Sequence, residues 1–333
     1  MKLLNTTFVI GAALGLGLAI SGSAQAKSEL RLSTVVNKPH PWIEAAEYMA
    51  SEVAKRTGGE IKVNVFPGGA LGKDQTAIDE MRMGTVDFVI GSTQNAAPFV
   101  PEYQIFSLSY LFKDIDSFRK VTAHNGPLFK KLSGLVEDRG LGFKLLALTG
   151  GGVRNMSNSV RPIKTPDDLK GLKMRVTAAK VEAKIWKALG TLPTSLPWTE
   201  LYTAAQTGVV EGFESSISGY RGSKLYEVGP YHAKTQHQVM TSHISISTAT
   251  YNRLPEKFRK VIETVAVEAA DLCTKKGEEF DARFLDELQA KHGVKVNEVD
   301  KAAFMARVLP LQDEFAESNK MTDLLEMIRT GQK

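Results

Sequence analysis

Two arginines in different local contexts are the side chains of this sequence best suited to bind an anion. Arg154 follows a run of glycines in GGGVRNMSN, and Arg175 lies 21 residues further on in LKGLKMRV. Arginine keeps its charge at any ordinary pH, and its planar fork matches a carboxylate with two parallel hydrogen bonds. The pair therefore indicates a pocket for a small organic anion, although the spacing alone is equally compatible with two exposed arginines.

The sequence lacks the residues that the common catalytic and metal-binding motifs require. The stretch from Pro67 to Asp74 resembles a phosphate-binding loop, but Pro67 replaces its first glycine and Asp74 stands where Ser or Thr must bind magnesium. The sequence has no G-x-S-x-G elbow of a serine hydrolase. His232, His237 and His243 have no acid or cysteine at metal-ligand spacing. We therefore expect no cofactor, no metal and no enzymatic activity.

Alternating strand and helix signals must position the two arginines, and this alternation is typical of an α/β fold. The apolar run 141–148 predicts a strand that leads into the glycines before Arg154 and crosses from one lobe to another. Residues 172–176 predict a strand that carries Arg175. Thr199 is predicted to cap a helix over the residues that follow it.

Two segments share one pattern, which suggests two lobes of related architecture. MGTVDF at 83–88 and TGVVEG at 207–212 both indicate a helix end, a Gly stop, a valine, an acid and a strand start. We expect mixed sheets flanked by helices, with a cleft between the lobes. Lobe I is expected to comprise 27–150 and about 241–278, and lobe II 151–240 and about 279–330, with C-terminal helices that brace the lobes.

The first 26 residues have the pattern of a secretory signal peptide. Lys2 supplies the positive end, 8–20 is an apolar run, and Ala24 and Ala26 are the small residues that a signal peptidase requires. We predict cleavage after Ala26 and export to the periplasm. The remaining 307 residues carry a net charge of +4 instead of +5, because Lys2 is removed. The single cysteine, Cys273, excludes an internal disulfide, and no basic stripe with interleaved aromatics indicates a nucleic-acid partner.

A series of sequence segments occurs in the order typical of one family. It begins with FPGGALGKDQ, DEMRMGTVDFVIGS and SLSYLF and continues through GVRNMSNSVRPIKTPDDLKGLKMRV and PWTELYTAAQTGVVEGFES. SKLYEVGPY, TQH and YNRLPEKFRKVI complete it. Over essentially the whole chain after residue 26, the protein thus resembles the solute-binding subunits of TRAP transporters, the DctP-like periplasmic receptors for organic acids. The resemblance implies a two-lobed periplasmic binding protein of type II-like architecture.

The same resemblance implies roles for individual residues. Arg175 in KMRV matches the arginine that pairs with the ligand carboxylate, and Arg154 in GVRN matches a second arginine that supports the site. Trp198 stands where the family has a bulky residue that lines the pocket. Glu214 and His237 match residues that join Arg154 in a polar cluster near the hinge.

Three further positions are candidates for ligand contact. Ser215 stands where many sialate-type members have Asn, and Ser92 replaces an acid that is frequent in those members. Both departures argue against a sialic-acid ligand. Asn37 follows a predicted strand end in the first lobe, where ligands commonly meet α/β sheets, as do three other residues, Trp42, Gln94 and Asn95.

The resemblance also implies a ligand class and partners. We expect a small organic carboxylate (a sugar acid, a hydroxy or keto acid, or a dicarboxylate) that is passed to TRAP membrane subunits by a monomeric receptor. The alternative is a periplasmic enzyme that acts on an organic acid and shares the same two-lobed fold. A nucleophile or a paired general acid and base in the cleft would favour that enzyme, and the sequence shows neither.

Overall fold

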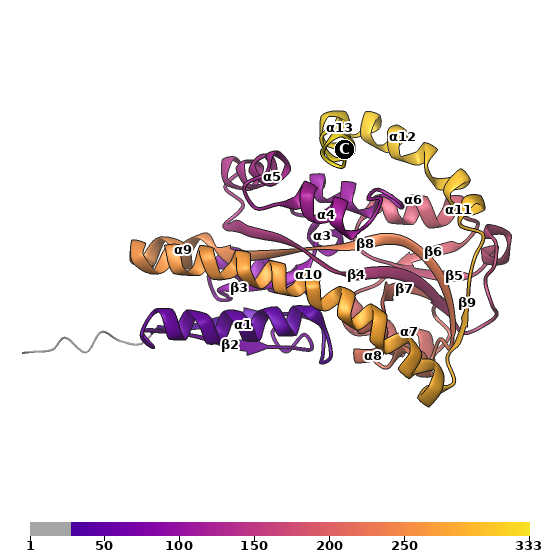
Figure 1. Cartoon of the computed structure of the whole chain (residues 1–333), viewed down its shortest axis with the longest axis horizontal. Coiled ribbons are helices and arrows are strands. Elements are labelled where there is room, and N and C mark those ends of the chain that lie inside the picture. Colours follow the sequence, from indigo (N-terminus) through magenta and orange to yellow (C-terminus); the bar gives the residue numbers. More distant parts are fainter. Residues whose placement is uncertain (1–27) are drawn as a thin grey trace, which may run out of the picture.

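The computed structural model describes residues 28–333, so the predicted signal peptide lies outside the described residues. A nine-stranded sheet forms the framework, in the order β2-β1-β3-β8-β4-β7-β5-β6, with β9 paired to β8. Both parallel and antiparallel neighbours occur in it, and helices cover both faces (Figure 1). The expected mixed α/β architecture is therefore confirmed, with the difference that the two halves share one continuous sheet.

Two long antiparallel strands, β4 (Phe143–Asn158) and β8 (Tyr231–Ser247), join the two halves of the sheet. The sequence predicted the first of them only over 141–148 and expected it to lead into the glycine run. In the structure the strand continues through the glycines. Its pairing with β8 shifts register between Gly150 and Val153, which bends the strand without ending it.

Parallel strands and their connecting helices build the first half. β1 pairs with β2 and β3, and β3 pairs with β8. Helix α1 links β1 to β2, and α2 links β2 to β3. The bounds are β1 (Ser28–Ser33), α1 (Pro41–Arg56), β2 (Ile61–Phe66), α2 (Asp74–Met83), β3 (Phe88–Ser92), α3 (Thr93–Ala96) and the 3-10 helix η1 (Pro101–Ser107).

The second half repeats this pattern around β5 and β7. The parts are η2 (Pro166–Leu169), β5 (Lys173–Val176), α6 (Lys180–Ala188), β6 (Leu192–Ser195), η3 (Trp198–Glu200), α7 (Leu201–Gln206), β7 (Gly212–Ser216), α8 (Ile217–Gly222) and η4 (Leu225–Glu227). The two similar sequence segments fold alike. Gly84 and Gly208 follow α2 and α7 with positive φ, and Ser92 and Ser216 then cap the short helices α3 and α8.

One helix of 37 residues, α10 (Glu256–His292), runs along the whole sheet and spans about 55 Å. With α1 it covers the first half, and with α7 and α8 it covers the second (Figure 1). The opposite face is covered by a second layer of helices, which includes α4 (Ile115–Thr122), α5 (Pro127–Asp138), α6 and the C-terminal helices. The remaining elements are α9 (Thr248–Arg253), β9 (Lys295–Asn297), α11 (Lys301–Val308), α12 (Pro310–Ser318) and α13 (Thr322–Gly331).

One local expectation differs from the structure, and another stays a prediction. Thr199 does not cap a helix, because it lies inside the 3-10 turn η3 and the residue before α7 is Glu200, which makes no capping bond. The expected boundary between the lobes near residue 278 falls inside α10, which continues through it without a break. The division into lobes stays a prediction.

Candidate binding site

A small cavity lies where the two halves of the sheet face each other. The first half contributes Val36, Trp42 and Ser92 to its wall, and the second half contributes Arg175 and Ser215. It offers only about 30 Å³ of space, and nearly all of its lining side chains are buried. Any organic acid is larger than this, so the walls must separate to admit one.

Arg175 is the most unusual side chain in this cavity. It lies on β5 and is 1% exposed, and its Nε donates to the carbonyl of Leu196 at 3.0 Å. Both of its Nη atoms are buried without a hydrogen-bond partner. Burial lowers the pKa of the guanidinium, but the group remains charged at any ordinary pH. A buried, unpaired cation is strongly unfavourable unless an anion joins it, so the arrangement favours carboxylate binding.

Arg154, in contrast, is already paired. It lies on β4 opposite β7, and its Nε and Nη2 form a two-pronged ion pair with the carboxylate of Glu214. Its Nη2 also donates to the backbone carbonyl of Glu214 at 3.1 Å, and its Nη1 approaches Sδ of Met240 at 3.3 Å. Burial alone would raise the pKa of Glu214, but the charge and hydrogen bonds of Arg154, together with His237, lower it. Glu214 is therefore an anion in the core.

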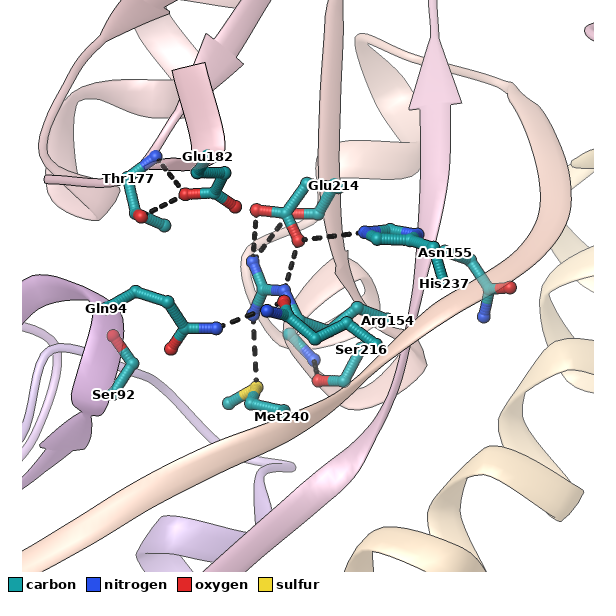
Figure 2. A network of polar contacts seen from close by, with 12 residues as sticks. Ser92, Gln94, Arg154, Asn155, Thr177, Glu182, Glu214, Ser216, His237 and Met240 are labelled. Atoms are coloured by element: carbon teal, nitrogen blue, oxygen red, sulfur yellow. Dashed lines mark hydrogen bonds and ion pairs between the residues drawn. The ribbon is translucent and has the colours of Figure 1, made fainter. Parts of the chain in front are cut away.

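His237 completes this cluster from β8. Its Nε2 lies 3.7 Å from Oε2 of Glu214, and its Nδ1 shares a 2.9 Å hydrogen bond with the hydroxyl of Thr235. Burial lowers the pKa of the imidazole, although Glu214 opposes this, and the ring is neutral at pH 7. Figure 2 shows Glu214 between Arg154 and His237. The structure thus brings together the three residues that the family resemblance linked.

Glu182 is a member of the polar network that sequence reasoning missed. It lies on α6, is 3% exposed, and accepts hydrogen bonds from the backbone N–H and the hydroxyl of Thr177. Its carboxyl group lies beside that of Glu214 in Figure 2. Burial and the negative charge of Glu214 raise the pKa of Glu182 to about 8, so it is protonated at pH 7. Its position three and four residues before buried Ile185 and Trp186 was the signal that it faces the core.

The other sequence candidates fall into two groups. Trp198, Ser215 and Ser92 line the cavity, and Trp198 places its ring 5.7 Å from the Arg175 guanidinium carbon. The hydroxyl of Ser215 is buried without a partner, whereas that of Ser92 caps α3. Asn37 does not line the cavity. It is exposed, and its side chain lies beside Gly68.

The wall from the first half is aromatic and polar but carries no full charge. The indole N–H of Trp42 donates to the hydroxyl of Ser242 at 2.9 Å, and the ring packs edge-on against His40. Burial and then the charge of Arg154 lower the pKa of His40 to about 3, so this histidine is neutral. Asn95, a candidate from its strand-end position, lines the cavity and accepts a 3.3 Å hydrogen bond from the backbone of Ala178 in the other half.

Three features of the part of the chain that the structure describes concern metal binding, membrane spanning and cysteine chemistry. Among residues 28–333, no group of His, Cys, Asp and Glu side chains is arranged to hold a metal ion. Within the same range no helix is both long and apolar enough to span a bilayer. Cys273, on α10, is buried.

The family model described as bacterial extracellular solute-binding protein, family 7 (DctP), matches residues 32–319. The chain belongs to this family. A solute-binding protein of Verminephrobacter eiseniae is 33% identical over 94% of this chain and 91% of the relative.

Two solved structures show the same fold. The sugar acid binding protein of Advenella mimigardefordensis, in complex with galactonate, is 27% identical with a TM-score of 0.86 and covers 92% of this chain and 99% of its own. A TRAP periplasmic solute-binding protein of Polaromonas, bound to D-erythronate, is 31% identical with a TM-score of 0.85 over 92% and 98% of the two chains. The chain is thus a TRAP-type solute-binding subunit, and this family consists of receptors.

Proposed function

We propose that this receptor binds a small organic carboxylate through Arg175 and delivers it to the membrane subunits of a TRAP transporter. The observation that carries the proposal is the buried guanidinium whose two Nη atoms have no partner. A carboxylate would accept two parallel hydrogen bonds from these atoms and neutralise the charge. The relatives with bound galactonate and D-erythronate support the same ligand class.

The neighbouring residues have supporting roles in this proposal. Arg154, Glu214 and His237 form a paired cluster that holds β4, β7 and β8 together behind the ligand. Trp198 stacks beside Arg175, and Ser215 offers a free hydroxyl to the ligand. Ser92 lines the opposite wall. Asn37 has no place in the proposed site, because it is exposed outside the cavity.

Ligand entry requires the two halves to move apart, because the cavity is far smaller than an organic acid. Contacts between residues distant in sequence hold its mouth closed. Asn95 meets Ala178, and Lys73 on the first half lies 4.0 Å from Glu200 on the second. The Lys73–Glu200 ion pair is exposed and the Asn95–Ala178 hydrogen bond is partly buried, and both break and re-form in this proposal as the halves hinge about β4, β8 and α10. The division into lobes 27–150 with 241–278 and 151–240 with 279–330 describes the two moving bodies.

The remaining parts of the proposal concern location and chemistry. We propose that the N-terminal 26 residues direct export to the periplasm and are removed after Ala26. The receptor acts as a monomer, with no nucleic-acid partner. It is not an enzyme, because the buried acids serve other purposes. Glu214 is ion-paired to Arg154, and Glu182 is hydrogen-bonded to Thr177. Neither carboxyl group is free to act as a general base.

A thermal-shift screen of residues 27–333 tests the proposal. The panel contains sugar acids, hydroxy and keto acids and dicarboxylates, each beside its neutral amide. A ligand that binds only the folded state raises the melting temperature by mass action. We expect at least one acid to raise it and the matching amide to leave it unchanged. An amide that shifts it as much as its acid would contradict a role for the carboxylate.

A further inference from the structure

The cavity contains one guanidinium group that still has hydrogen-bond donors available for an anion. Arg154 is committed to Glu214 through its two-pronged ion pair. Arg175 uses only Nε, and its nearest carboxylate oxygen, Oε1 of Glu214, is 4.0 Å from Nη1, beyond hydrogen-bond distance. Among the residues that line the cavity, Arg175 is therefore the single cation left for an anion.

The rest of the wall cannot supply a second positive charge. Its polar members are hydroxyl and amide groups, and its apolar members include Trp42, Trp198 and Met240. His40 also lines the cavity, but burial keeps it neutral at pH 7. Hydroxyl and amide groups bind the hydroxyls of a ligand well, yet they leave a carboxylate without a full counter-charge.

Acidic side chains close to the cavity also oppose a second negative charge. Asp74 is buried on α2, and its carboxylate accepts a 2.9 Å hydrogen bond from the side chain of Asn95, which lines the cavity. Burial raises the pKa of Asp74 to about 6, although the charge of Arg175 lowers it, so Asp74 is ionised at pH 7. Glu214 is a second buried anion near Arg175. A second ligand carboxylate would therefore meet like charges.

We propose that this site selects acids with one carboxylate and rejects the dicarboxylates that share their carbon skeleton. The proposal rests on the proposed receptor function and narrows its ligand class. One carboxylate neutralises Arg175, and the hydroxyls of the ligand bind groups such as Ser215 and Asn95. A second carboxylate is buried without a cation, which is strongly unfavourable.

Matched acid pairs test this proposal by isothermal titration calorimetry of the chain from residue 27 at pH 7. D-erythronate is compared with meso-tartrate, and D-galactonate with galactarate, because each pair differs only by a terminal carboxylate in place of a hydroxymethyl group. In each pair that binds, we expect the monocarboxylate to bind at least about 100-fold more tightly. Equal or tighter binding of the dicarboxylate would overturn the charge limit and leave the receptor function intact. Failure of a broad panel of mono- and dicarboxylates to bind would overturn both.

A charge variant near the cavity gives an independent readout. Asp74→Asn removes a buried negative charge, and Asp79→Asn removes an exposed one from the same helix, so the second is the matched control. The effect of a lost negative charge scales with the charge of the ligand. We expect Asp74→Asn to reduce the ratio of monocarboxylate to dicarboxylate affinity by at least about 3-fold. Asp79→Asn should leave the preference unchanged. If the affinity ratio stays at its wild-type value in both variants, the charge of Asp74 does not contribute to the selection of monocarboxylates.

Discussion

Of the two buried arginines at the cavity, one is ion-paired within the protein and the other has no hydrogen-bonded anion. The arginine without a hydrogen-bonded anion is the one that we propose binds the ligand. Glu214 receives both prongs of Arg154 and lies near His237, so most of its hydrogen-bonding capacity is used within the protein. Arg175, on the neighbouring strand β5, is left without an anion of its own. Glu182 could supply one, but burial keeps it protonated at pH 7. We propose that the ligand carboxylate takes that place.

The sequence identified much of this site because its motifs surround the residues that matter. Arg175 and Arg154 were singled out from their contexts, and the family resemblance added Glu214 and His237. The structure brings all four together, while their roles in binding stay predictions. Asn37 was misplaced because β1 ends at Ser33 rather than three residues later. From this segment, the buried residues Val35 and Val36 line the cavity. The chain then turns outward, so Asn37 is exposed.

The protonation of Glu182 predicts a pH dependence of binding. An ionised Glu182 would compete with the ligand carboxylate for the positive charge of Arg175. Because the pKa of Glu182 is raised to about 8, affinity is at its full value below this pH and is lost as the pH rises above it. We expect the affinity to fall by up to about tenfold per pH unit there, as one proton is linked to binding.

Glu182→Gln is the variant that tests this dependence, because Gln keeps the shape and neutrality of the protonated acid. Titration calorimetry with an acid found in the screen should show near wild-type affinity for the variant at pH 7 and no decline above pH 8. Other groups near Glu182 do not share its titration range, since Arg154 and Arg175 stay charged and His237 is neutral. An alkaline decline of the same size in Glu182→Gln would refute the role of Glu182.

At the scale of the elements, the contact between α10 and the bent part of β4 sets how the two halves are joined. Asp281 on α10 accepts a 2.6 Å hydrogen bond from the backbone N–H of Val153, the residue before Arg154. Gly277, one turn earlier, lies directly against Gly152. The glycine run of β4 thus serves a close approach of two backbones. The sequence analysis ended β4 too early, because sequence alone cannot distinguish a glycine that allows packing from one that ends a strand.

Gly277→Ala should destabilise the fold. A Cβ at this position would lie 2.5 Å from the backbone nitrogen of Gly152, so the helix or the strand must shift. We expect the free energy of unfolding in urea to fall by about 1–3 kcal/mol. Gly134→Ala in α5 is the matched control, because its Cβ would meet no atom within 4 Å. That control should be neutral or more stable by up to about 1 kcal/mol. Equal stability of the two variants would show that the α10–β4 contact is not close-packed.

At the scale of the whole molecule, the sheet is continuous while the contacts across the cavity mouth are sparse. The two halves share β4, β8 and α10. Each packs its own core on the side of α10, and one core spans both halves on the opposite face. Motion is therefore expected at the shared elements rather than within either core. This organisation follows from chain connectivity, which crosses between the halves at β4, β8 and α10 and returns to the first half through the C-terminal helices. Sequence patterns predicted related halves, but they could not show that one sheet runs through both.

Small-angle X-ray scattering should detect the opening and closing of the mouth. In solution without ligand, separation of the halves breaks exposed contacts such as that between Lys73 and Glu200. Exposed ion pairs of this kind contribute only about 0–1 kcal/mol, so this contact opposes opening only weakly. A binding acid should reduce the radius of gyration, and its amide should not. A radius that is the same with and without a saturating acid would contradict hinged closure.

The most direct test of the central claim is titration calorimetry of Arg175→Met beside the wild type, with one acid from the screen. Methionine fills part of the space of the arginine but offers no charge and no hydrogen-bond donor. We predict that affinity falls by at least about 30-fold, which corresponds to a loss of about 2 kcal/mol or more, because the ligand carboxylate is left unpaired. The unfolding free energy without ligand should change little, since the substitution removes a buried cation whose two Nη atoms have no hydrogen-bond partner. Tight binding of the acid by a folded Arg175→Met variant would contradict the account.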